Sequence, residues 1–385
     1  IAIGAFSLDA NTTTGSNTAI GYESLTANTT GSKNVALGNN TLAANTTGAE
    51  GTAVGYNALA SNTTASYNVA VGEAALNANT TGDRNVAVGQ NALTSCDTHS
   101  ANVAIGFEAM KLNTANSNTA VGAYCLDANT TGGDVTAVGS ASLGANTTGG
   151  YNTAMGVSAL GANTTASYNS AFGSAALAAN TTGAENTAVG YQALNDNTTA
   201  SYGTAVGYNA LEANTTGANN TAIGNDALLA NTTGASNTAV GYQSLGANTT
   251  ADENTSMGFQ SLLLNTTGTK NVAVGAYALD ANTTTGTHTA IGYQALSANT
   301  TGAQQTAVGA YALAANTTGT QNIAIGWGAI NANTTGDYNV ALGFAAMYNG
   351  SGGGGSNMAI GRYSLYENTT GKCNAAVGGN TLVAN

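Results

Sequence analysis

The chain has 385 residues, no proline, 52 glycines and only 6% charged residues, with a net charge of −12 at pH 7. Six basic residues in this length cannot form the Lys/Arg patch that phosphate binding requires, so the composition excludes nucleic acid as a partner. No apolar run approaches the roughly 18 residues that a membrane span needs, so we expect no membrane insertion by this segment.

A repeat of 17 residues runs through the chain, and residues 17–33 show one copy, N-T-A-I-G-Y-E-S-L-T-A-N-T-T-G-S-K, whose positions we number 1 to 17. Copies follow from Asn17 to Asn374, and an incomplete one fills residues 1–16, which makes 23. A fixed period of this kind indicates a solenoid, so we treat residues 1–385 as one repetitive domain. Because the chain lacks an initial methionine and stops inside a copy, we expect it to be a piece of a longer fibre.

Positions 2–5 of each copy predict a short strand followed by a turn. In T-A-V-G, β-branched residues at positions 2 and 4 alternate with a small residue at position 3, which is the period of a strand. Position 3 is alanine in every copy but one, Ser256. We expect it opposite the core, at or near a subunit contact, with a tightly packed interior of the same chain as the alternative. Position 5 is glycine in all 23 copies, which predicts a turn of positive φ.

Positions 8–15 predict a second strand and a second turn. Leucine occupies position 9 in twenty copies and faces the same way as alanine at position 11, and A-N-T-T-G at positions 11–15 is rich in turn residues. The glycines at positions 5 and 15 argue against a helix. Two strands and two turns per 17 residues predict an all-β fold, a parallel β-solenoid of about 23 coils.

The small apolar core of each coil favours an oligomer. One leucine, one valine and two alanines bury too little apolar surface to offset the ordering of a whole coil. We therefore expect hydrogen-bond ladders between coils and an interface with other copies of the chain to supply the remaining stability.

The segment Thr18-Ala19-Ile20-Gly21, followed by Ser24-Leu25, resembles the YadA-like head repeats of trimeric autotransporter adhesins. The complete unit also resembles repeats of bacteriophage tail-fibre proteins, and the resemblance covers essentially the whole chain. It implies a left-handed β-roll that forms a homotrimer outside the cell, as a cell-surface filament or a virion fibre, and binds a host or surface receptor. The adhesin repeat is shorter than this one, and the excess here lies in the A-N-T-T-G turn.

The Asn-Thr-Thr of that turn matches the acceptor pattern for N-glycosylation and allows two interpretations. Either the asparagines carry glycans along one edge, or their stacked amides form a hydrogen-bonded ladder between coils. The residues concerned are Asn11, Asn28, Asn45, Asn62, Asn79, Asn129, Asn146, Asn163, Asn180, Asn197, Asn214, Asn231, Asn248, Asn265, Asn282, Asn299, Asn316, Asn333 and Asn368.

Aromatic residues recur at position 6 and predict a surface row that stacks on sugars or, alternatively, packs between coils or subunits. The row comprises Tyr22, Tyr56, Tyr191, Tyr208, Tyr242, Tyr293 and Trp327. Position 17 adds further tyrosines, namely Tyr67, Tyr151, Tyr168, Tyr202 and Tyr338.

Two interruptions of the repeat are candidate functional sites. Cys96, Asp97 and His99 suggest a metal or nucleophile cluster, but a single copy without a paired ligand set favours drift of the repeat. The glycine-rich residues 350–356 lack the lysine of a phosphate-binding loop, so a bulge at a coil edge is the simpler interpretation. We therefore expect no enzyme activity, cofactor or metal.

These observations predict a non-enzymatic extracellular fibre shaft or adhesin head that attaches to a cell or surface. The alternatives are a phage tail-fibre shaft or a carbohydrate-binding module that uses the aromatic rows. A more remote alternative is an ice-binding solenoid, although the threonine array at position 2 is interrupted by other residues.

Overall fold

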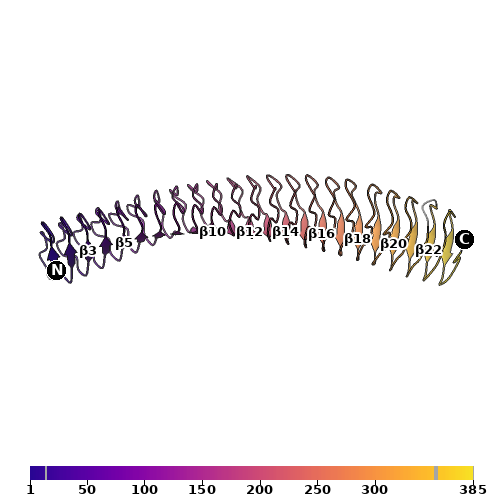
Figure 1. Cartoon of the computed structure of the whole chain (residues 1–385), viewed down its shortest axis with the longest axis horizontal. Coiled ribbons are helices and arrows are strands. Elements are labelled where there is room, and N and C mark those ends of the chain that lie inside the picture. Colours follow the sequence, from indigo (N-terminus) through magenta and orange to yellow (C-terminus); the bar gives the residue numbers. More distant parts are fainter. Residues whose placement is uncertain (14, 351–353, 385) are drawn as a thin grey trace. The chain divides into compact units, whose positions relative to one another are not determined.

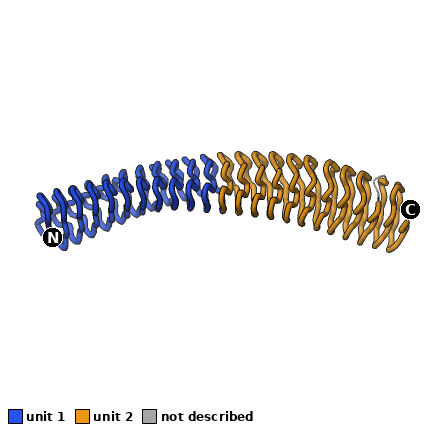
Figure 2. The backbone as a smooth tube through the Cα atoms, in the orientation of Figure 1, with its two compact units in different colours: residues 1–189 blue, residues 190–385 orange. Residues whose placement is uncertain are grey.

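The computed structural model describes residues 1–13, 15–350 and 354–384. They form an all-β structure with 23 strands, and none of these residues lies in a helix, so no membrane-spanning helix occurs among them. The chain divides into two compact units, residues 1–189 and 190–385 (Figure 2). Each unit is a parallel β-solenoid in which every copy of the repeat forms one coil with one strand (Figure 1). The predicted all-β parallel solenoid is therefore confirmed for each unit.

The strands occupy positions 2–4 of each copy. Those of the first unit are β1 (Ala2–Ile3), β2 (Thr18–Ile20), β3 (Val35–Leu37), β4 (Thr52–Val54), β5 (Val69–Val71), β6 (Val86–Val88), β7 (Val103–Ile105), β8 (Thr119–Val121), β9 (Thr136–Val138), β10 (Thr153–Met155), β11 (Ser170–Phe172) and β12 (Thr187–Val189). Those of the second unit are β13 (Thr204–Val206), β14 (Thr221–Ile223), β15 (Thr238–Val240), β16 (Thr255–Met257), β17 (Val272–Val274), β18 (Thr289–Ile291), β19 (Thr306–Val308), β20 (Ile323–Ile325), β21 (Val340–Leu342), β22 (Met358–Ile360) and β23 (Ala375–Val377).

Within each unit, neighbouring strands pair in parallel with equal repeat positions opposite each other. In β10 and β11, for example, Ala154 pairs with Ala171. The two copies that depart from 17 residues keep this register, since Val103 still pairs with Thr119 and Val340 with Met358. The turns therefore absorb the missing or additional residue, and the side chains continue to stack by position.

Alanine at position 3 lies inside the coil, and our first expectation for it was wrong. Ala154 is fully buried together with Ala159 and Leu160 of positions 8 and 9, whereas Met155 at position 4 is 42% exposed. The alternative, a tightly packed interior of the same chain, is confirmed. Leucine at position 9 already fills the narrow coil, so the strand opposite it has room for little more than a methyl group.

The second predicted strand is also wrong, because positions 6–11 form a turn. Two of its residues adopt a left-handed backbone, as Ser158 (φ 56°) and Leu160 (φ 51°) show. This conformation costs a non-glycine residue roughly 1–2 kcal/mol. The cost is offset because the leucine side chain becomes buried and its N–H donates to the Ala176 carbonyl of the next coil at 3.0 Å.

Glycine at position 5 makes the predicted turn of positive φ, and a second constraint acts on it. Gly156 has a φ of 145°, and a Cβ atom there would lie 2.3 Å from the carbonyl oxygen of Gly173 in the next coil. Any side chain would therefore push neighbouring coils apart as well as strain the backbone. The absence of variation at this position in the repeat follows from both constraints.

Candidate functional site

The asparagines of the Asn-Thr-Thr turns lie inside the coils, and all those named above except Asn11 are buried. Nδ2 of Asn45 donates to Oδ1 of Asn28 at 2.9 Å, and Nδ2 of Asn62 donates in turn to Oδ1 of Asn45 at 2.8 Å. The same bond recurs in both units, so these side chains form a ladder. Attaching a glycan to Nδ2 would break it, and the geometry of the folded coil therefore favours the ladder over glycosylation.

A second set of buried asparagines, at position 1, closes most of the coils. Nδ2 of Asn34 donates to the Gly48 carbonyl of its own coil, while its Oδ1 accepts the N–H of Gly51 in the next coil, each at 2.8 Å. Nδ2 of Asn45 donates to the same Gly48 carbonyl at 3.1 Å. The buried amides are thereby paired, as buried polar groups must be to avoid a large desolvation cost.

The ladder is interrupted at Cys96, which takes the place of asparagine at position 12. Its Sγ donates to the His99 carbonyl at 3.4 Å, which reproduces the bond that asparagine makes three residues along the chain. A thiol offers only one donor. Oδ1 of Asn79 in the preceding coil is consequently buried without a partner among the described residues.

The side chains of Cys96 and Asp97 make structural hydrogen bonds, whereas Nδ1 of His99 is buried without a hydrogen-bond partner among the described residues. Burial raises the pKa of Cys96 to about 11, so this thiol stays protonated at neutral pH and is a poor nucleophile. Asp97 accepts the hydroxyl of Thr80 at 2.7 Å. In the part of the chain that the structure describes, no group of three His, Cys, Asp or Glu side chains is placed to hold a metal ion.

His288 replaces asparagine at position 1 of its coil. Nδ1 accepts the N–H of Gln305 at 3.2 Å, as the asparagine oxygen does elsewhere, and Nε2 lies 3.0 Å from Oγ1 of Thr285. This pairing requires a neutral ring with its proton on Nε2. The side chain is 1% exposed, and burial lowers its pKa to about 4.

The predicted aromatic row is exposed, but most of its rings contact other rings. Tyr191 stacks on Tyr208 with centroids 5.4 Å apart, and Tyr22 meets Phe6 edge to face at 5.8 Å. Rings that cover one another in this way have less free face to offer a sugar. The contacts between coils are those expected of the packing alternative.

In the second unit, a connected series of ring contacts runs from Tyr242 to Tyr366. It includes Phe259 and Phe344 of position 6, and it adds residues of positions 7 and 10 that the position-6 pattern did not identify, namely Tyr277, Tyr311, Tyr348 and Tyr363. The turn at positions 6–11 explains this, since its left-handed residues bring these positions to one edge of the coil. Gly328 leaves room for the ring of Tyr348, because a Cβ atom on this glycine would lie 2.8 Å from the ring.

The outward face of the strands carries side chains of positions 2 and 4. They are valine, isoleucine, threonine, methionine, leucine, phenylalanine, serine or alanine, and no described strand carries a charged residue. Several are more than a third exposed, among them Leu37, Met155, Ile223 and Leu342. We call the side chains at these two positions the strand face.

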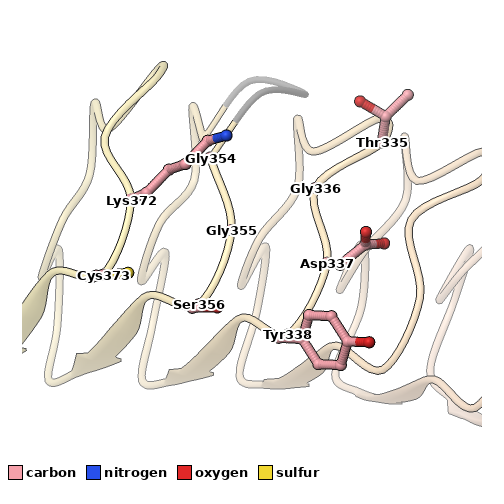
Figure 3. A pocket seen from close by; sticks show the side chains of 9 residues that line it. All are labelled: Thr335, Gly336, Asp337, Tyr338, Gly354, Gly355, Ser356, Lys372 and Cys373. Atoms are coloured by element: carbon pink, nitrogen blue, oxygen red, sulfur yellow. The ribbon is translucent and has the colours of Figure 1, made fainter.

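Two shallow hollows lie beside the A-N-T-T-G turns, where position 16 carries glycine. One, of about 370 Å³, is lined by Thr335, Asp337 and Tyr338 of one coil and by Gly355 and Lys372 of the two coils that follow (Figure 3). The glycine-rich segment noted in the sequence includes residues 351–353, so the interpretation of it as a bulge lies partly outside the described residues.

The second hollow, of about 340 Å³, lies in the first unit. Gly133 and Gly150 line it, together with Thr131, Asp134 and Tyr151 among others. We call it the glycine hollow. The signal for this hollow in the sequence is a combination of positions that no single position shows: two successive glycines at position 16, Gly133 and Gly150, next to two successive tyrosines at position 17, Tyr151 and Tyr168.

No protein-family model matches the chain, and no curated protein matches it either. Any functional conclusion therefore depends on the repeat and on the geometry described above.

Proposed function

We propose that this chain is the shaft or head of a homotrimeric, left-handed β-roll fibre outside the cell, which attaches to a cell or surface without catalysing a reaction. The observation that carries the proposal is the strand face. It presents apolar side chains at position 4 of every strand and no charge.

A single copy of the chain would leave this apolar stripe in water. In each unit, eleven or more strands at about 4.8 Å each make the stripe about 50 Å long. Exposed apolar patches of such extent usually mark an interface in soluble proteins. Three copies that meet along their strand faces would cover it, and this agrees with the trimer that the resemblance to adhesin and tail-fibre repeats implies.

The attachment role is supported by where the coils differ. Inward positions are nearly uniform along the repeat, whereas positions 6, 7, 10, 16 and 17, which are exposed or half-buried, vary from coil to coil. Contacts with a receptor would therefore be made by the turns. In such an arrangement the uniform interior holds the coils in register, and the turns supply the specificity.

Adhesion of beads coated with the full chain tests the attachment role. Coated beads are expected to bind at least one of a panel of bacterial cells, animal cells and polysaccharide surfaces at least tenfold more than albumin-coated beads. Circular dichroism of the same protein checks that it is folded. No adhesion above the albumin level by the folded, trimeric chain would contradict the proposal.

A further inference from the structure

We propose that the glycine hollow binds the ring of a neutral pyranose sugar, which stacks on Tyr151. This inference deepens the attachment role, on which it rests, by naming a ligand class and one site. It depends on two irregularities that coincide there and that occur together nowhere else in the repeat.

The first irregularity is the pair of glycines at position 16. In several other coils a polar side chain at this position covers the backbone of the preceding coil, whereas alanine occupies it in others. Oδ1 of Asp83 accepts the N–H of Ser66 at 2.7 Å, and Oγ of Ser167 accepts the N–H of Gly150 at 3.1 Å.

Gly150 has no side chain to offer in this way. The N–H of Gly133 in the preceding coil is therefore without a protein acceptor among the described residues. A Cβ atom on Gly150 would lie 3.7 Å from that nitrogen, so a longer side chain would fill the hollow at this point. Because position 16 has no side chain in these two coils, the glycine hollow contains both free space and the unpaired Gly133 N–H.

The second irregularity is the pair of tyrosines at position 17. The rings of Tyr151 and Tyr168 are parallel, with an interplanar angle of 1° and centroids 5.1 Å apart, and they are 58% and 59% exposed. Tyr168 covers one face of the Tyr151 ring and holds it in place. The opposite face is turned toward the preceding coil, whose residue at position 17 is Asp134.

An aromatic face beside a carboxylate suits a sugar. The apolar C–H face of a pyranose packs on an aromatic ring, and its hydroxyls donate to a carboxylate and accept from N–H and O–H groups. Here Asp134 provides the acceptor, while the Gly133 N–H and the exposed hydroxyls of Thr131 and Thr148 provide donors.

Size and charge narrow the ligand further. The volume of about 340 Å³ lies near the lower end of the roughly 300–1,000 Å³ of ligand pockets, which suits one ring. Asp134 and the net charge of −12 would repel acidic sugars, so the ligand is expected to be neutral.

The test is binding of a panel of neutral methyl hexopyranosides to the full chain, measured by saturation-transfer NMR and calorimetry. We expect binding of a subset of the panel and at least a tenfold loss of affinity in Gly150→Ser. In that variant the new hydroxyl would accept the Gly133 N–H, as Ser167 does for Gly150. Tyr151→Asn is expected to weaken binding similarly, since Asn219 shows that position 17 tolerates asparagine.

Matched controls change the same positions away from the hollow. Ala218→Ser adds the same hydroxyl at position 16, and Tyr202→Asn removes an equally exposed tyrosine, so both should bind like the original chain. The inference is overturned if no pyranoside binds, or if the controls weaken binding as much as the hollow variants. Bead adhesion that persists without pyranoside binding would overturn this inference alone, whereas loss of adhesion by the folded chain would overturn the attachment role.

Discussion

Replacing Cys96 with asparagine should stabilise its coil, because it restores the missing member of the buried ladder. The new Nδ2 would donate to Oδ1 of Asn79, which now has no partner in the described structure, and to the His99 carbonyl. An unsatisfied buried acceptor costs about 1–3 kcal/mol, and a neutral hydrogen bond contributes about 1 kcal/mol. We therefore expect the free energy of local unfolding to rise by about 2 kcal/mol.

Hydrogen exchange followed by mass spectrometry is the appropriate assay, because an array of repeats need not unfold in one two-state step. A gain of about 2 kcal/mol slows exchange about 30-fold, and the effect should be confined to residues 76–117. Cys96→Ala, which removes the thiol without adding an amide, should give no such gain. Unchanged exchange in Cys96→Asn, or an equal gain in Cys96→Ala, would refute the reasoning.

Three further predictions concern other buried positions. Burial holds the pKa of His288 at about 4, below its usual 6.5, so the imidazole binds a proton in the unfolded chain at a higher pH than in the folded chain. The stability of its coil should therefore be full above about pH 6.5 and drop by about 3 kcal/mol toward pH 4. Hydrogen exchange in His288→Asn should not show this loss. Iodoacetamide at about pH 8 should label the exposed Cys373 but not Cys96 and Cys125, because burial raises the pKa values of these two thiols to about 11 and about 12. Rapid labelling of either buried thiol would show that the coils open. Gly156→Ala should destabilise its coil by about 3 kcal/mol or more in the same exchange assay, whereas Gly144→Ala, where the nearest atom lies 3.4 Å from the new Cβ, should have little effect.

The coil length, the parallel register and the glycine turn were predictable because each depends on a residue type that recurs at a fixed spacing. Which side chains of the strand point into the core was not predictable, since the residues on both of its faces are apolar. Ala154 and Met155 could each have pointed inward, and only the space left by Leu160 decides between them. The left-handed backbone of Leu160 was equally unpredictable from the sequence, because leucine normally avoids this conformation.

The candidate sites were predictable only in part, since they depend on contacts between coils. Position 6 alone identified Trp327 but not its stacking partner Tyr348, which occupies position 10. The glycine hollow depends on side chains that are missing from successive coils, and a search for chemically reactive residues passes over glycine. The Asn-Thr-Thr pattern had two interpretations until burial of Asn28 and its neighbours was known.

The molecular mass in solution tests the central claim, a trimer built on the strand face, most directly. Light scattering on the eluting full chain should give about three times 37.5 kDa, or about 112 kDa. The double variant Val121→Lys with Val138→Lys places two charges on the strand face and should lower this mass while the circular dichroism spectrum stays unchanged. Thr165→Lys, which lies outside the strand face, should leave the mass unchanged. A folded monomer of 37.5 kDa at micromolar concentration would contradict the account.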